Sequence, residues 1–121
     1  MVETSEINLD RGVINPSHPP IIGVVEMAAS SSALKAGTIL KLSSGKYSGA
    51  SASDDPAAVL VQDVEAHADG TVNARVLLHG IAVSSRLLTG AQAAATDTLK
   101  NKLPATGIYL TQAVWDESNF N

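Results

Sequence analysis

The side chains in this sequence that could do chemistry are three histidines, one pair of aspartates and one run of serines. His18, His67 and His79 show neither a His-x-His nor a His-Glu-x-x-His spacing, and the chain has no cysteine. A zinc site needs such ligands in clusters at short spacings. We therefore predict no metal site at the histidines. We expect His79, which falls in a predicted strand, to be packed or to lie at a subunit interface.

The aspartate pair, Asp54 and Asp55, directly precedes Pro56. Two carboxylates can serve as acid and base or can bind calcium. Neighbouring residues of a strand point to opposite faces, however, and aspartates in a loop commonly cap a turn. A turn cap is the favoured interpretation, and a calcium site is the alternative.

The serines at positions 30–32 lack the Gly-x-Ser-x-Gly context of an activated nucleophile, and no glycine-rich phosphate-binding motif occurs. No reaction class can be assembled from the residues of one chain, although a site shared between subunits stays open. We predict a protein that is not an enzyme, with no catalytic residue, no metal and no cofactor.

The composition indicates one small domain with an aliphatic core. The chain has 121 residues and only one Trp, two Tyr and one Phe, so it can build one modest core that would gain from oligomerisation. The net charge is −4 and the basic residues are scattered, which argues against nucleic-acid binding. No apolar run approaches the roughly 20 residues of a membrane span, and the acidic start of the chain is unlike a signal peptide.

Residues 1–20 differ from the rest of the chain because they are polar and contain three prolines. Proline holds φ near −65° and removes a backbone donor, so we expect an extended arm, free or bound to a partner. A flexible terminus without a function is the alternative. The residues expected to contact a partner are Ile7, Leu9, Val13, Ile14, Pro16, Pro19 and Pro20.

Short β-rich runs separated by turn signals dominate the rest of the chain. Gly45 can supply the positive φ of a tight hairpin turn. Gly80 interrupts the apolar alternation of residues 71–85 and indicates a bulge or a bend. We expect residues 28–37 to form one loose helical turn that ends at Gly37. The expected strands are residues 21–27, 38–42, 46–47, 57–66, 71–85 and 107–115.

One short helix is expected at about residues 96–103. Thr96 can cap its first turn, Asp97 and Lys100 complement the helix dipole, and Pro104 ends it. The strands do not alternate with full-length helices, so a doubly wound α/β fold is excluded. The sequence therefore predicts a mainly β protein.

The predicted domain covers residues 21–113, and residues 114–121 form a tail. The tail carries Trp115 and Phe120. Exposed aromatic side chains at a terminus often anchor an interface, and the other interpretation is that they fold back over their own domain. Both interpretations stay open.

Residues 36 to about 113 resemble the lambda-type bacteriophage head decoration (capsid cement) proteins. The resemblance depends on an ordered series of segments: "AGTILKLSSGKY", the loop ending "SDDP", "AAVLVQDVEA", "TVNARVLLHGIAV" and "AAATDTLKNKLPATGIYL". The resemblance does not extend to the arm, which corresponds by position only, or to the tail.

This resemblance implies a β-clip fold, a bent ribbon with an incomplete barrel. It also implies a homotrimer at local threefold sites of the expanded phage head, which clamps neighbouring major capsid subunits. The partners would be the major capsid protein and further copies of the chain, with no nucleic acid, no membrane and no cofactor. The protein would be made in the cytoplasm of a bacterial host and would lie on the outer surface of the virion. Two alternatives remain: another virion-associated binding module, on a tail or fibre, and a trimeric β-clip nucleotide hydrolase, whose motifs are not recognisable here.

Overall fold

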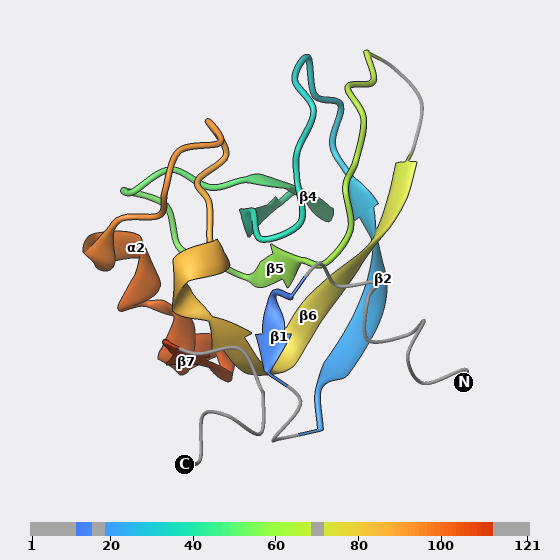
Figure 1. Ribbon diagram of the computed structural model, residues 1–121. Coiled ribbons are helices and arrows are strands. Elements are labelled where there is room, and N and C mark those ends of the chain that lie inside the picture. The colour runs from blue at the N-terminus through green and yellow to red at the C-terminus, as the bar shows by residue number, and fades with distance from the viewer. Residues whose placement is uncertain (1–11, 16–18, 69–71, 113–121) are drawn as a thin grey trace.

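The computed structural model describes residues 12–15, 19–68 and 72–112, and these residues form a mainly β fold, which confirms the predicted fold class (Figure 1). The strands are β1 (Ile14–Asn15), β2 (Ile21–Met27), β3 (Ile39–Ser43), β4 (Lys46–Gly49), β5 (Ala58–Leu60), β6 (Val72–Val83) and β7 (Ile108–Thr111). The helical turns are η1 (Ser84–Arg86), α2 (Asp97–Lys100) and η2 (Leu103–Thr106).

The strand β6 organises the sheet, because it is 12 residues long and pairs with four other strands. Its first part pairs with β2 and β5, and its last part, from Gly80 onward, pairs with β1 and β7. Gly80 has a φ of +144°, and the ladder with β2 is irregular just before it, where Leu78 is passed over between two pairs. The predicted bulge or bend near Gly80 is therefore confirmed.

The strands β2, β4, β3, β5 and β6 form a ladder that returns on itself, since β5 pairs with β6 and β6 pairs with β2. The ladder is weakest between β2 and β4, which share one parallel pair, Met27 with Tyr47. The arrangement is a small barrel that is nearly open on that side.

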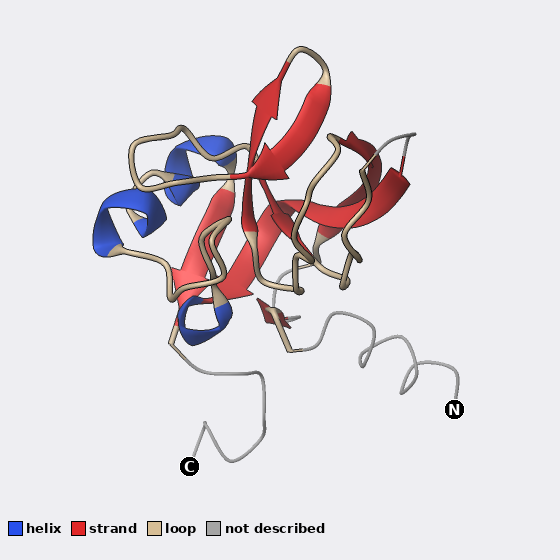
Figure 2. Cartoon of the chain, turned by 90° about the horizontal axis from the view of Figure 1, so that it is seen from above, coloured by secondary structure: helices blue, strands red, loops and turns tan. Residues whose placement is uncertain are grey.

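Two clusters of buried side chains lie on the opposite faces of the sheet. Ile39 belongs to one cluster and Leu40 to the other, and Val59 and Leu60 divide in the same way. Because side chains alternate across a strand, a strand with both faces covered reads as a continuous apolar run. This explains the run of apolar residues around β5. Figure 2 shows that the helical turns gather on one side of the strands.

The predicted helix at residues 96–103 is present but shorter than expected. The Thr96 Oγ1 accepts a hydrogen bond from the Leu99 backbone N–H at 3.4 Å, which confirms the predicted cap. The α-helix ends at Lys100, and Pro104 does not terminate it but lies in the first turn of η2. A proline has no N–H to donate to a continuing α-helix but fits the first turn of a new one, so the chain divides into α2 and η2. The Leu99 and Leu103 side chains are fully buried.

The hairpin of β3 and β4 follows the prediction, and the segment before it does not. Ser44 and Gly45 both have positive φ, 53° and 82°, as a two-residue hairpin turn requires. Residues 28–37 form no helical turn, because Ser30 and Leu34 make antiparallel bridges to His67 and Val64. Those distant hydrogen bonds outweigh the weak helix propensity of a serine-rich segment.

Four expected strands differ in length from those observed. The strand expected at 71–85 is observed as β6, which ends at Val83 and is followed by η1. The strand expected at 46–47 continues to Gly49, and the one expected at 57–66 is regular only over β5. The final strand β7 ends at Thr111, and residues 113–115 of the expected strand lie outside the described residues.

The Gln92 side chain joins the segment after η1 to the turn before β3. Its Nε2 donates to the Thr38 Oγ1 at 2.9 Å and to the Thr89 carbonyl at 3.2 Å, and its Oε1 accepts from the Lys35 N–H at 2.9 Å. Thr38 is fully buried. We expect Gln92→Ala to lower the free energy of unfolding by roughly 1–2 kcal/mol, because three hydrogen bonds are lost at a part-buried position. Urea unfolding with an unchanged m-value would test this, and an unchanged midpoint would contradict it.

Candidate interaction surface at the chain ends

The first and last described segments of the chain pair with the same part of β6, one on each side of it. β1 pairs Ile14 with Ala82 of β6 in antiparallel orientation, and β7 pairs Leu110 with the same Ala82 in parallel orientation. Both strands therefore flank the final part of β6, at one end of the molecule (Figure 1). A partner that contacts this end can reach both ends of the described chain.

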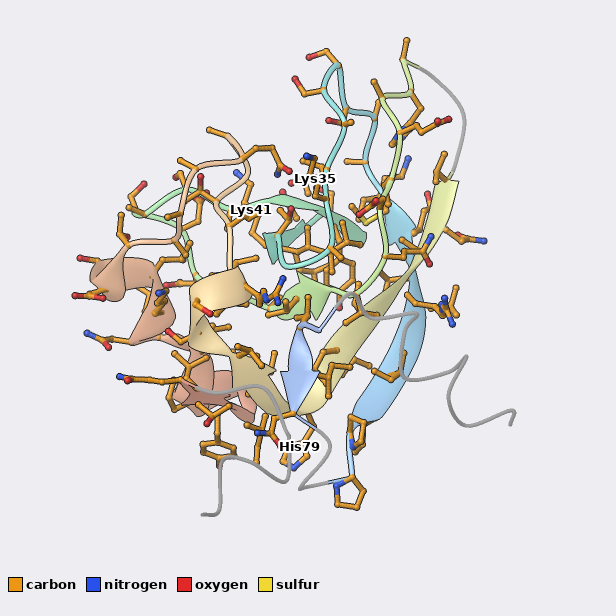
Figure 3. All side chains as sticks on the ribbon, viewed as in Figure 1. Lys35, Lys41 and His79 are labelled. Carbon is orange, nitrogen blue, oxygen red and sulfur yellow. The ribbon has the colours of Figure 1, made fainter. Side chains whose placement is uncertain are left out.

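A surface of apolar and aromatic side chains covers this end of the molecule. Ile21 pairs with His79, and the imidazole of His79 meets the ring of Tyr109 edge-on, with centroids 6.3 Å apart. Tyr109 is 51% exposed and Ile21 is 56% exposed, although large apolar side chains are usually buried. Figure 3 shows His79 at this end, beside β1. We call Pro19, Pro20, Ile21, His79 and Tyr109 the base surface.

Two glycines shape the base surface. Gly107 has a φ of +94°, and a Cβ there would lie 2.7 Å from the His79 Nδ1. Gly80 has a positive φ too, and a Cβ there would lie 3.2 Å from the Pro20 Cα. A side chain at either position would displace the imidazole or the proline, so these glycines allow the base surface to pack.

Val13 and Ile14, which we expected in a partner-binding arm, lie instead in the core. Val13 is 1% exposed and Ile14 is 7% exposed. The Val13 carbonyl accepts a hydrogen bond from the Val83 N–H at 2.7 Å. An apolar side chain that already packs in its own core is unavailable to a partner. Val13 and Ile14 therefore do not belong to the predicted arm, and residues 1–11 of that arm lie outside the described residues.

The other expected interaction residues divide into two groups. Pro19, Pro20 and His79 lie on the base surface. Ile7, Leu9, Pro16, Trp115 and Phe120 lie outside the described residues. Sequence reasoning missed Ile21 and Tyr109 as surface residues. The alternation of Ile108, Tyr109 and Leu110 could have indicated that Tyr109 points outward, because Ile108 is fully buried.

Asp54 caps a turn, as the favoured interpretation of the aspartate pair stated. Its Oδ2 accepts hydrogen bonds from the Ser51 N–H at 2.8 Å and from the Ser51 Oγ at 3.0 Å. The Lys41 Nζ lies 3.4 Å from the same oxygen. Asp55 is exposed and lies 3.8 Å from the Lys102 Nζ. The pair thus lies in a loop that contacts Lys41 of β3 and Lys102, the residue before η2.

These contacts make the contribution of Asp54 to the free energy of unfolding depend on pH. The hydrogen bonds from Ser51, followed by the nearby Lys41 ammonium, lower the pKa of Asp54 below its ordinary value of 3.8. A carboxylate with a lowered pKa stabilises the folded chain above the pKa of the unfolded state, and this contribution is lost as the pH falls through the folded-state pKa.

At neutral pH we expect wild-type protein to have a higher free energy of unfolding than Asp54→Asn, and we expect this difference to disappear as the pH falls below about 4. The difference in free energy of unfolding between the two proteins, measured by urea unfolding at several pH values, should decrease toward acid. A difference that grows toward acid would contradict the assignment. The exposed Asp55→Asn variant is the matched control and should behave like wild type.

The remaining candidate groups have structural partners. The His67 ring nitrogens lie 3.1 Å from the Glu65 carbonyl and 3.0 Å from the Ala28 carbonyl. The Asp63 Oδ1 accepts from the Ala36 N–H at 2.9 Å. The Ser30 Oγ donates to the Ser32 carbonyl at 2.7 Å. Each of these side chains therefore binds the backbone of a neighbouring loop.

Comparisons with known proteins add no family. No protein-family model matches the sequence, and no curated protein matches it significantly. Within residues 12–15, 19–68 and 72–112, no group of three or more potential ligands is placed to hold a metal ion. None of the helices in this part of the chain has the length and apolar character needed to cross a bilayer.

Proposed function

We propose that this protein is a structural decoration protein of a phage head. It binds as a trimer at local threefold sites of the expanded capsid and clamps neighbouring major capsid subunits. The observation that supports this most directly is the ordered series of segments shared with the head decoration proteins. In this chain those segments form β3, β4, β5, β6, α2 and β7 around common cores.

The base surface supports an orientation for this binding. It contains two half-exposed apolar side chains, Ile21 and Tyr109, and it lies where β1 and β7 flank β6. Apolar and aromatic groups are enriched at the centres of interfaces. In the proposed complex this surface faces the capsid, and the arm, residues 1–11, contacts the major capsid protein.

The arm supplies the clamp in this proposal. Ile7 and Leu9 stand at alternate positions, so an extended arm would present both on one face when it adds a strand to a sheet edge of the capsid. Ordering the arm costs roughly 1–2 kcal/mol per residue. Three arms on one trimer offset this cost through their high effective concentration.

Co-sedimentation with expanded, undecorated capsids tests the function. We expect saturable binding in multiples of three copies per local threefold site, together with a higher temperature of capsid disruption. A chain that remains in the supernatant at all concentrations would overturn the proposal. Unexpanded capsids are the control, because their threefold sites differ.

The base surface has a matched control on the same chain. Tyr109 and Leu42 are exposed to almost the same degree, 51% and 52%, but Leu42 lies on the β3–β4 hairpin. We expect Tyr109→Ser to weaken capsid binding at least about tenfold, as truncation of a central aromatic anchor commonly does. Leu42→Ser should bind like wild type. Equal losses in both variants would contradict the proposed orientation.

A further inference from the structure

No strand among the described residues pairs with the outer edge of β2 before Met27. Over Ile21–Glu26 the described residues pair with β6 on one side, and β4 reaches β2 only at Met27. Figure 1 shows β2 along the outside of the molecule beside β6. Ile22 is 40% exposed and Val24 is 68% exposed, the highest value among the exposed large apolar residues.

Natural edge strands are usually protected from further pairing by inward-pointing charges, lysines, prolines or bulges. β2 has none of these between Ile21 and Val25. The irregularity in its ladder with β6 places the extra residue, Leu78, on β6 and leaves β2 uninterrupted. An exposed apolar edge without such protection indicates that another strand covers it.

The sequence of this edge is self-complementary. β2 begins Ile-Ile-Gly-Val-Val, with two β-branched residues on each side of Gly23. If two copies paired antiparallel about Gly23, Ile22 of one copy would stand opposite Val24 of the other, and Ile21 would stand opposite Val25. Cross-strand pairs of β-branched residues stabilise sheets.

The same register determines where the pairing between the two copies ends. One step beyond Ile21 and Val25, Pro20 of one copy would meet Glu26 of the other. Proline has no N–H to donate, so the ladder would end there. Glu26 would remain at the margin, where the Lys46 Nζ lies 3.3 Å from its carboxylate. The pairing therefore encloses apolar residues only and leaves the charges outside.

We propose that β2 pairs with β2 of a second copy of this chain, antiparallel across a two-fold axis at Gly23. The contact joins two sheets edge to edge through five residues on each side, so it is small and depends on concentration. It differs in symmetry from the threefold contact of the proposed function, and it shares Ile21 with the base surface. Because it is two-fold, it joins two single chains into a dimer, and it joins two trimers into a hexamer when all three β2 edges of one trimer meet those of the other.

The mass in solution tests this proposal. Light scattering or sedimentation of the full chain should show an even-numbered species, of two or six copies, that grows with concentration at the expense of one or three copies. Val24→Lys should raise the dissociation constant of this species at least about tenfold, because each copy places a charge in the apolar contact. Leu42→Lys is the matched control and should leave it unchanged. Odd-numbered species alone up to about 1 mM, or equal effects of both variants, would overturn the proposal.

Disulfide trapping tests the register, because the native chain has no cysteine. Mixing Ile22→Cys with Val24→Cys chains and oxidising them should give the mixed dimer in excess over the two self-linked dimers. Directly opposite residues have Cβ atoms about 4.5–5.5 Å apart, whereas the diagonal positions are about 7–8 Å apart. If the mixed dimer is no more abundant than links through Leu42→Cys, a partner other than β2 of a second copy occupies the edge.

Discussion

Deletion of residues 1–11 should leave a folded domain that no longer binds expanded capsids. The buried side chains of the described core begin at Val13, so the deletion removes none of them. It removes Ile7 and Leu9, which the proposed arm uses to add a strand to the capsid sheet. We expect the affinity for capsids to fall at least a hundredfold, because three arms act together on one trimer. Circular dichroism and co-sedimentation measure the two parts of this prediction.

A longer deletion, of residues 1–15, is the control that separates the arm from the core. It removes Val13 and Ile14 as well, and burial of two such side chains contributes roughly 3–6 kcal/mol. We expect this variant to be strongly destabilised or unfolded. Capsid binding by the shorter deletion at wild-type affinity would contradict the arm, and a fully stable longer deletion would contradict the packing of β1.

Gly37→Ala should produce a large loss of stability. Gly37 has a φ of +101°, and a Cβ there would lie 2.1 Å from the Arg86 carbonyl oxygen. The Gly37 N–H donates to the Leu60 carbonyl at 2.7 Å, and its carbonyl accepts from the Leu88 N–H at 2.9 Å. These two hydrogen bonds fix the backbone of Gly37 on both sides, so it cannot move away from the added Cβ without breaking one of them. We expect a loss of roughly 3 kcal/mol or more in the free energy of unfolding.

Gly45→Ala provides the comparison for Gly37→Ala. Gly45 also has a positive φ, +82°, but a Cβ there meets no atom within 4 Å. This substitution should cost only the left-handed conformation, roughly 1–2 kcal/mol. Thermal and urea unfolding of both variants measure the difference. Similar losses in the two variants would show that the contact with Arg86 does not decide the effect.

Sequence patterns predicted the elements whose causes are local. The Ser44-Gly45 turn needs residues that accept positive φ, and the Thr96 cap needs a hydroxyl at the start of a helix. The core strand β5 was visible as a continuous apolar run because both of its faces are covered. These patterns can be interpreted without the tertiary structure because each depends on residues that are close together in the sequence.

The errors arose where pairing joins distant parts of the chain. Val13 and Ile14 looked like part of an arm because a strand as short as β1 has no periodicity, and only its pairing with β6 gives it a place. The segment 28–37 was expected to form a helical turn, yet Ser30 and Leu34 make β-bridges to residues 67 and 64 instead. Neither partner can be inferred from the local sequence.

By itself the sequence determined that this protein is mainly β, that a hairpin turn lies at Gly45 and a bulge or bend near Gly80, and that its capped helix begins after Thr96. Only the tertiary structure decided which apolar residues are core and which are surface. Val13 and Val24 are both valines next to an isoleucine or another valine, but Val13 is covered by β6 and its cluster while Val24 lies on an open edge. The physical reason is that burial depends on which distant strands cover a side chain, and hydrophobicity alone does not specify them.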